Sequence, residues 1–490
     1  TAGVNHIFYH GMTYTPPGEQ WPGWMFYASV NFGPMSSFWG EMKSFNEYVT
    51  RCQSVMQGTE PSNDILLYFP IYDLWLSEKG FNLNLSVHNI GKWLWGSEFY
   101  KTAKLLKRRG YCFDYVSDSL LDEFSMTEGG ELVSGGSRYR AVVIPDCEYM
   151  PVETAEKILE LAKAGADVIF AGGVDKDVPG FYKFEERREQ LAGIIGEMKD
   201  EVVVTSEVGK VLEGEGILGE EFVEASVDFI RKRHDEGFVY FLVNLSNDVV
   251  DRWFELGKEA GAAILVDPLR DVWGQAEMRN RGGRTDVYLQ LEPGESVILK
   301  TFDGRKRFGK KWVYAVDKSE FEIRGRWRIE FVEGEPVSGE SFEMDELKSW
   351  SVLSENAKNF GGTARYSTTF ELPGERADEW VLDLGKVCES AKVWVNCKEV
   401  RTLWSIPFKV NVSDYVRKGE NKLIVDVTNL GANRIAWMDR RGVKWKKFKN
   451  ANVVNINYGK FDASGWEPME SGLIGPVKLI AIDRKSNFNQ

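Results

Sequence analysis

The spacing of apolar residues changes along this chain of 490 residues, and the change limits the folds that it can adopt. Between residues 64 and 205, short apolar runs such as 65–69 and 141–144 alternate with segments whose apolar residues recur every three or four positions. Short buried strands that alternate with amphipathic helices are typical of a parallel, doubly wound α/β sheet. Between residues 325 and 485, apolar and polar residues alternate one by one, which predicts an all-β sandwich or jelly roll.

Two other segments have patterns of their own. Residues 238–243 and 287–291 read as strands bounded by turn-forming residues, so we expect a small antiparallel β unit there. At the start of the chain, an apolar run at 3–10, a loop rich in Pro, Gly and aromatic residues, and a helix with an apolar stripe over 38–56 make one βα unit. Such units build β/α barrels. One unit cannot close a barrel, so we expect an upstream barrel segment.

The predicted fold class is therefore a multidomain α/β plus all-β protein, and a chain of this length allows roughly three domains. The charged stretch at 303–311 is interpreted as a solvated linker. The expected domains are the end of a β/α barrel (1–60), a parallel, Rossmann-like α/β domain (61–212), a small antiparallel β domain (213–302) and a carboxy-terminal β-sandwich or jelly roll (320–486).

Charge and composition exclude several classes of function. The formal net charge is -13 and there is no long basic run, so a phosphate backbone would be repelled and nucleic-acid binding is not expected. The five cysteines include no close pair of the metal-binding type, so neither a zinc site nor a disulfide framework is expected. No apolar run approaches the roughly 20 residues that cross a membrane, and none resembles a signal peptide. The localisation is left open.

Aromatic residues are abundant, with 17 Trp, 18 Tyr and 29 Phe. Aromatic rings stack on the apolar C–H faces of sugars, so this excess suits a glycan-binding protein, although large β-rich cores share it. Five segments, among them Gly-Val-Asn-His-Ile-Phe-Tyr-His-Gly, resemble the late-barrel region of glycoside hydrolase family 106, the α-L-rhamnosidases: 3–11, 21–29, 50–53, 66–70 and 113–118. Others resemble the galactose-binding-type jelly roll attached to many glycosidases: 362–366, 382–385, 393–396, 419–423 and 471–477.

The first resemblance implies an inverting glycoside hydrolase whose acid and base are carboxylates and whose site holds calcium. In such a site a neutral acid protonates the departing oxygen while an ionised carboxylate, roughly 6.5–9.5 Å away, activates water from the opposite face. We therefore expect an enzyme that releases a terminal sugar, α-L-rhamnose, from an oligosaccharide or glycoside substrate. Two interpretations remain as alternatives: a non-catalytic carbohydrate-binding and scaffolding fragment, and a β-galactosidase-like hydrolase.

The loop after the first predicted strand holds the first candidate site residues. Glu19 is the only carboxylate in this loop, and loops at the carboxyl ends of barrel strands carry the chemistry, so Glu19 is the candidate catalytic base or hydroxyl ligand. A solvated loop glutamate is the alternative. His10 ends the strand and is a candidate hydrogen-bond partner for a sugar hydroxyl. Trp21, Trp24 and Tyr27 are candidate stacking residues, or simply pack the loop.

The α/β domain supplies the other candidate substrate-binding residues. Asp73 and Trp75 follow a predicted strand, at the carboxyl end where α/β sheets bind their ligands, and Asp118 follows another strand. His88 lies in a loop that we expect to reach towards the barrel. For each of these residues a structural role is the alternative.

A general acid is the missing part of the predicted site. Glu41 and Glu47 fall on the polar side of the striped helix, so we expect both side chains to be exposed to solvent. No other carboxylate near the barrel unit is a convincing acid. We therefore expect the acid in the upstream segment.

Overall fold

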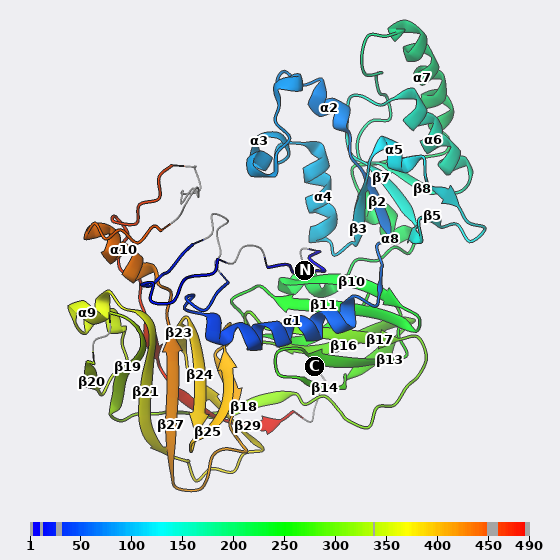
Figure 1. The fold of residues 1–490 in the computed structure, drawn as a ribbon. Helices are drawn as coiled ribbons and strands as arrows, with labels where there is room; N and C mark the ends of the chain where they lie inside the picture. The colour runs from blue at the N-terminus through cyan, green and yellow to red at the C-terminus, as the bar shows by residue number, and fades with distance from the viewer. Residues whose placement is uncertain (1–2, 10–12, 26–31, 337–338, 448–458, 486–490) are drawn as a thin grey trace. The chain divides into compact units, whose positions relative to one another are not determined.

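The computed structural model describes residues 3–9, 13–25, 32–336, 339–447 and 459–485. The chain divides into two compact units (Figure 1). Unit 1 combines a parallel α/β sheet with antiparallel sheets, and unit 2 is β-rich. This confirms the coarse prediction of a multidomain chain that mixes α/β and β-rich parts. The units comprise Thr1–Gly3, Ser54–Leu291 and Ser296–Trp312 (unit 1), and Val4–Gln53, Glu292–Glu295 and Val313–Gln490 (unit 2).

Unit 1 contains a five-stranded parallel sheet with the strand order β3-β2-β7-β8-β9. All four residues of β2 and all four of β7 are buried, because helices pack on both faces of the sheet. The strands are β2 (Ile65–Tyr68), β3 (Phe113–Val116), β7 (Ala141–Ile144), β8 (Asp167–Phe170) and β9 (Val203–Val204). The packed helices are α4 (Glu98–Arg108), α6 (Val152–Lys163), α7 (Phe184–Met198) and α8 (Val208–Gly214).

Each face of this parallel sheet has its own core, since successive strand residues point to opposite faces. Leu66 and Val142 pack with residues of α6 and α7, whereas Leu67 and Val143 pack with residues of α4 and α8. In chain order the strands run 2-1-3-4-5 across the sheet, so the order reverses between β2 and β7. Ligands of α/β proteins bind at the carboxyl ends of the strands beside such a reversal.

The antiparallel part of unit 1 packs around aromatic residues. The ring of Phe222 lies 5.8 Å from that of Tyr240 and 5.4 Å from that of Phe254. One sheet has the order β1 (Glu60–Pro61), β10 (Val227–His234), β11 (Gly237–Asn244), β17 (Ser296–Phe302), β13 (Ala262–Asp267) and β14 (Val272–Gln275). The other has the order β12 (Val250–Glu255), β16 (Arg284–Leu291) and β15 (Met278–Arg281). Short elements fill the connections: α2 (Ile71–Trp75), α3 (Ile90–Trp93), α5 (Asp118–Leu121), β4 (Ser125–Met126), β5 (Leu132–Ser134) and β6 (Ser137–Tyr139).

Unit 2 is built from antiparallel strands with helices at its edges. One sheet has the order β18 (Ala315–Glu322), β29 (Lys478–Arg484), β22 (Glu379–Asp383) and β26 (Lys409–Asn411). A second has the order β20 (Ser341–Met344), β19 (Trp327–Glu335), β21 (Gly361–Glu371), β27 (Glu420–Thr428), β24 (Ser390–Val395) and β25 (Lys398–Leu403). The remaining elements are the pair β23 (Lys386–Cys388) and β28 (Gly472–Gly475), and the helices α9 (Glu355–Lys358) and α10 (Ala432–Arg440).

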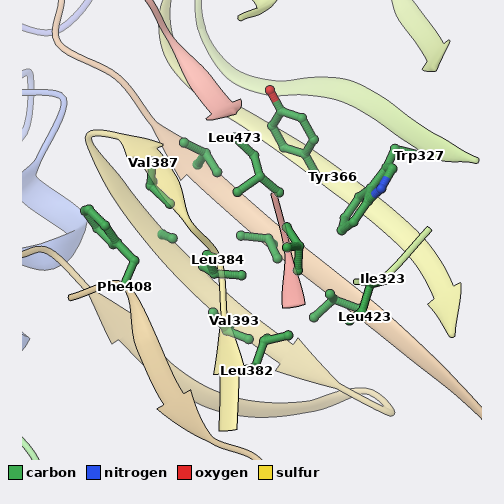
Figure 2. Close-up of a cluster of buried hydrophobic side chains, with 14 of the residues drawn as sticks. Ile323, Trp327, Tyr366, Leu382, Leu384, Val387, Val393, Phe408, Leu423 and Leu473 are labelled. Carbon is green, nitrogen blue, oxygen red and sulfur yellow. The ribbon is translucent and has the colours of Figure 1, made fainter. Parts of the chain in front are cut away.

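Both sheets of unit 2 contribute to one apolar core cluster (Figure 2). Leu382 comes from the four-stranded sheet, and Trp327, Tyr366 and Val393 come from the six-stranded sheet. Residues of β21 alternate between buried and less buried positions, as expected for a strand with one face on a core. The one-by-one alternation in the sequence thus reports which face of each strand is buried.

The predicted helix over 38–56 forms, as α1 (Met42–Met56) preceded by a 3₁₀ turn (Trp39–Glu41). In unit 2 the rings of Phe45 and Tyr48 meet the ring of Trp404 edge-on, at 5.2 and 5.4 Å. The longest described helices, α1 and α7, have 15 residues each. No described helix is long and apolar enough to span a membrane.

The strand predicted at 3–10 is wrong for the residues that the structure describes. Residues 3–9 form no regular secondary structure and are exposed, with Phe8 exposed by 79%. An apolar run indicates that side chains favour burial, but a strand also needs a neighbouring strand to accept its backbone hydrogen bonds. No described strand pairs with residues 3–9. The predicted βα unit therefore has its helix but not its strand.

Candidate functional site

A cavity of about 580 Å³ opens at the carboxyl edge of the parallel sheet in unit 1. Phe69 and Asp73 line it from the segment that follows β2, and Asp146 lines it from the segment that follows β7. These two strands flank the reversal of strand order, which is the usual ligand position in this kind of sheet. The volume also falls within the range of small-molecule sites, roughly 300–1,000 Å³.

The cavity wall combines aromatic and polar side chains. The rings of Phe69 and Phe99 meet edge-on, with their centroids 4.8 Å apart. Aromatic surface beside hydrogen-bonding groups is the combination that a sugar requires, because a sugar has C–H faces and hydroxyls. The other lining residues are Pro70, Leu74, Ser77, Glu78, Lys79, Leu83, Gly91, Lys92, Trp93, Gly96, Ser97 and Glu98.

Serine caps hold the outer wall of the cavity in place. The Ser97 hydroxyl accepts a hydrogen bond from the Tyr100 backbone N–H at 3.2 Å and thereby starts α4. Ser86 accepts the His88 N–H on its hydroxyl, at 3.2 Å, and the Trp93 indole N–H on its carbonyl, at 3.1 Å. The indole of Trp93 is therefore fixed by a hydrogen bond although it lies on a short helix.

Backbone N–H groups from the segment after β7 hold the side chain of Asp73, which lies in the segment after β2. Its carboxylate accepts hydrogen bonds from the N–H groups of Glu148 and Tyr149, each at 3.0 Å. Burial raises the pKa of this half-buried carboxyl, and the two N–H donors oppose that effect. The donors orient Asp73, and its place in the cavity wall leaves it available to a hydroxyl group.

Asp146 is more accessible than Asp73, with its side chain exposed by 60%. The Nζ atom of Lys176 lies 3.8 Å from it and donates to the carbonyls of Cys147 and Gly173, each at 2.6 Å. A Cβ atom at Gly172 would come within 2.4 Å of the Asp146 side chain. The missing side chain at Gly172 thus leaves the space that Asp146 occupies.

Of the predicted residues in unit 1, Asp73 lines the cavity and three do not, as far as the described residues show. Asp118 accepts hydrogen bonds from the Tyr68 and Thr154 hydroxyls, each at 2.7 Å. Trp75 packs edge-on against Tyr72 at 5.3 Å and is exposed by 38%. His88 is exposed in the 3₁₀ turn Val87–Asn89. Their predicted contacts with substrate stay predictions.

In unit 2, the predicted residues Glu19 and Trp24 lie together. Glu19 accepts hydrogen bonds from the Trp24 indole N–H, at 3.0 Å, and from the Lys447 ammonium group. These donors, Lys447 first, lower the pKa of the Glu19 carboxyl. Trp24 also pairs with Lys447 through a parallel backbone bridge. Glu19 is therefore ionised at neutral pH, as a catalytic base must be.

The other predicted loop residues are less informative about a site. The Trp21 indole donates to the Met35 carbonyl at 3.0 Å, and a Cβ atom at Gly431 would come within 2.6 Å of its ring. Trp21 therefore packs within unit 2. His10 and Tyr27 lie outside the described residues.

The cavity also contains residues that were not predicted from the sequence, notably Asp146 and Trp93. Asp146 comes directly after Pro145, which ends a predicted strand, so the rule that found Asp73 was also able to find it. Trp93 lies in the four-residue helix α3, which is too short to have an apolar period.

A metal site is the remaining part of the prediction. In the part of the chain that the structure describes, no group of three or more His, Cys, Asp or Glu side chains is arranged to hold a metal ion. Calcium also takes oxygen ligands from carbonyl groups and water, so the calcium site that the resemblance implies stays a prediction.

The chain is similar in sequence to one known glycosidase-type protein and in structure to another. A curated protein of Formosa agariphila, described as a putative beta-glucuronidase, is 37% identical over 229 residues, which cover 41% of this chain and 20% of that protein. The structure of a rhamnosidase from Novosphingobium sp. PP1Y matches with a TM-score of 0.69 at 20% identity, over 92% of this chain and 42% of that one. At this identity, the similarity to the rhamnosidase structure shows a common fold. This chain spans less than half the length of either relative.

Family models match both halves of the chain. A model of the sugar-binding domain of glycosyl hydrolases family 2 matches residues 305–446, most of the β-rich part of unit 2. The model of glycoside hydrolase family 106, described as alpha-L-rhamnosidase, matches residues 1–256, which include the cavity and more than half of the chain. The chain therefore belongs to glycoside hydrolase family 106, the α-L-rhamnosidase family.

Proposed function

We propose that this protein acts in the hydrolysis of α-L-rhamnosides and releases a terminal rhamnose from a larger glycan with inversion. The observation that carries the proposal is the ligand-sized cavity within residues 1–256, the part that matches the α-L-rhamnosidase family. The cavity lies at the sheet edge where α/β domains bind small molecules. The sugar-binding match at 305–446 supports a glycan substrate for the same chain.

The cavity is proposed to bind one sugar of the glycan. Phe69, Phe99 and Trp93 supply apolar surface for the C–H face and methyl group of a 6-deoxy sugar. Asp73 and Asp146 supply oxygen acceptors for its hydroxyls. The two facing sheets of unit 2 are assigned to a galactose-binding-like jelly roll, as the sequence predicts.

Glu19 is the proposed catalytic base. Its ion pair with Lys447 keeps the carboxylate ionised, and each carboxylate oxygen retains a second lone pair with which to accept a proton from water. The departing oxygen requires a neutral acid on the opposite face of the sugar. That acid is proposed to lie outside the described residues.

Hydrolysis of a panel of aryl glycosides tests the proposed function. The 490-residue chain and the full-length product of its gene are assayed with aryl α-L-rhamnoside, aryl β-D-galactoside and aryl β-D-glucuronide. The α-L-rhamnoside is expected to be the preferred substrate. Binding of rhamnose without turnover by either protein would support the scaffolding alternative. Hydrolysis of the galactoside or the glucuronide alone would overturn the proposed substrate.

The variant Glu19→Gln tests the base. It is expected to lower kcat for the rhamnoside by about 10²–10⁴-fold, the usual contribution of a positioned acid or base. Glu47→Gln is the matched control, because Glu47 is an exposed glutamate of α1 that contacts Arg51 at 3.9 Å. Equal rates for Glu19→Gln and the unmodified protein would remove Glu19 from the mechanism.

A further inference from the structure

Helix α10 and the residues after it carry a basic surface in a protein whose net charge is -13. We call Arg434, Trp437, Arg440, Arg441 and Lys444 the α10 basic surface. All five lie within the residues matched by the sugar-binding domain. Arg440, Arg441 and Lys444 are exposed. The surface therefore joins positive charge to an aromatic side chain in the part of the chain that is related to sugar-binding domains.

Trp437 connects two of the arginines. The guanidinium groups of Arg434 and Arg441 lie over its ring, with 4.3 and 5.8 Å between each Cζ atom and the ring centroid. Positions 434, 437 and 441 are three and four residues apart, so they share one side of the helix. Cation–π contacts of this kind orient a guanidinium group without occupying its N–H donors.

Arg434 has hydrogen-bond donors without acceptors among the described residues. Its Nε and Nη1 atoms are buried and have no hydrogen-bond partner. Burial lowers the pKa of the guanidinium group, and the charge of Glu335 opposes that effect. Unsatisfied buried donors cost free energy, so hydrogen bonding within the fold does not account for Arg434.

Other cations of unit 2 are paired with carboxylates. Arg365 forms two parallel hydrogen bonds with the Asp426 carboxylate, at 2.7 and 2.8 Å. Lys446 lies 3.1 Å from Asp439. Arg434 has neither arrangement, although it is more deeply placed than exposed Arg440 and Arg441. Arg434 therefore differs from Arg365, whose paired charge stabilises the fold.

We propose that the α10 basic surface binds the carboxylate groups of an acidic polysaccharide built from uronic acids. The planar fork of arginine matches a carboxylate, and several cations side by side match a chain with one carboxylate on each sugar. The Arg440 guanidinium donates to the Trp466 carbonyl at 3.1 Å, and Trp466, exposed by 45%, offers a ring on which a sugar can stack. This proposal takes one point from the proposed function, namely that the ligand is a glycan.

Calorimetric titration with polygalacturonate and with neutral galactan tests the proposal on the 490-residue chain. The unmodified chain is expected to bind polygalacturonate, more weakly as salt rises, and to bind galactan at least about tenfold more weakly. Single-stranded DNA is titrated as a second comparison ligand, because it is also a polyanion. Binding of DNA as tightly as polygalacturonate, or equal binding of both polysaccharides, would overturn the proposal.

The variant Arg440→Ser/Arg441→Ser is expected to weaken polygalacturonate binding by at least about tenfold, because two charged donors are lost. Lys398→Ser/Lys418→Ser is the matched control, since it removes two exposed cations elsewhere in unit 2 and is expected to change affinity by less than about twofold. Equal losses in the two variants would overturn the assignment to α10. Binding is measured without turnover, so failure here and failure of rhamnoside hydrolysis are distinguishable.

Arg434 needs a test that separates binding from folding. Arg434→Met removes the unsatisfied donors, so it is expected to leave Tm unchanged or higher while binding weakens. A fall in Tm with unchanged binding would show a structural arginine and remove Arg434 from the proposed surface. Arg434→Lys keeps the charge without the fork and is expected to restore binding only in part.

Discussion

Glu41 precedes α1 in unit 2 and has a carboxyl group that is largely withdrawn from water. Its Oε1 atom accepts a hydrogen bond from the Ser390 hydroxyl at 3.0 Å, whereas Oε2 is buried without a partner among the described residues. Burial raises the pKa of this carboxyl, the Ser390 and Thr428 hydroxyls oppose the effect, and the charge of Glu333 adds to it. A carboxyl withdrawn from water favours the protonated form.

The variant Glu41→Gln is expected to flatten the pH dependence of stability. A raised folded-state pKa means that the stabilising contribution is complete below the unfolded-state pKa, about 4.3, and is lost as pH rises through the folded value. Glutamine stays neutral, so the variant is expected to exceed the unmodified protein by about 1 kcal/mol at pH 7 and by less near pH 4. Unfolding curves measured across this range check it. Parallel pH profiles for the two proteins would contradict it.

Arg231 lies in a buried ionic cluster of unit 1, and its side chain is exposed by 1%. The Arg231 guanidinium donates a hydrogen bond to Glu220 at 2.7 Å and contacts Asp64. Lys258 donates a further hydrogen bond to Asp64, also at 2.7 Å. Burial alone would raise the pKa of Asp64, but Arg231 and Lys258 lower it below its ordinary value. The cluster joins the start of the parallel sheet to β10 of the antiparallel sheet.

The variant Arg231→Met is expected to destabilise the protein by about 3–5 kcal/mol, because Glu220 would remain buried without its cation and Asp64 would keep only Lys258. Chemical denaturation of unit 1 measures the loss. Arg138→Met is the control, since Arg138 forms an ion pair with Glu131 while its side chain is exposed by 59%. An equal, small effect of both variants would show that the buried cluster contributes no more than a surface pair.

At the level of elements, the segment from α2 to α4 forms the outer wall of the cavity. Trp93→Ala is expected to weaken L-rhamnose binding by about tenfold through the loss of stacking surface, and Trp93→Phe is expected to restore part of it. Trp95→Ala is the control, because Trp95 is a tryptophan of the same segment that is exposed by 59% and is not among the described residues that line the cavity. Ligand-observed NMR titrations compare the three. Weaker binding in the control alone would move the sugar site away from the cavity.

The sequence predicts the strands of the parallel sheet well because their apolar runs specify burial on both faces. It also identifies Asp73, since a strand end is visible as the end of an apolar run. The neighbouring Trp75 shows the limit of that rule. Both residues lie in α2, where positions two apart differ by about 200° in direction, so they point to different sides.

Other features depend on contacts between distant segments, which periodicity does not encode. Glu41 was predicted to be exposed because it lies on the polar side of its helix, and this prediction is wrong since Glu41 contacts Ser390. The strand at 3–10 fails for a related reason, because an apolar run does not specify a pairing partner. Lys447 and Glu19 are separated by 428 positions, so no local pattern indicates their contact.

At the scale of the whole molecule, the two proposed functions belong to different parts of the chain. Residues 1–256 belong to the α-L-rhamnosidase family and contain the cavity, and residues 305–446 match a sugar-binding domain and contain the α10 basic surface. One part is proposed to act on rhamnose and the other to hold an acidic glycan. The first of these proposals depends on the release of L-rhamnose by the protein.

The stereochemistry of the first sugar released is the most direct test of this function. Time-resolved ¹H NMR of an aryl α-L-rhamnoside with the full-length gene product shows which anomer forms before mutarotation. An inverting hydrolase is expected to release β-L-rhamnose first, because water attacks from the face opposite to the departing group. Release of α-L-rhamnose first, or no release while the aryl β-D-glucuronide is cleaved, would contradict the proposed reaction.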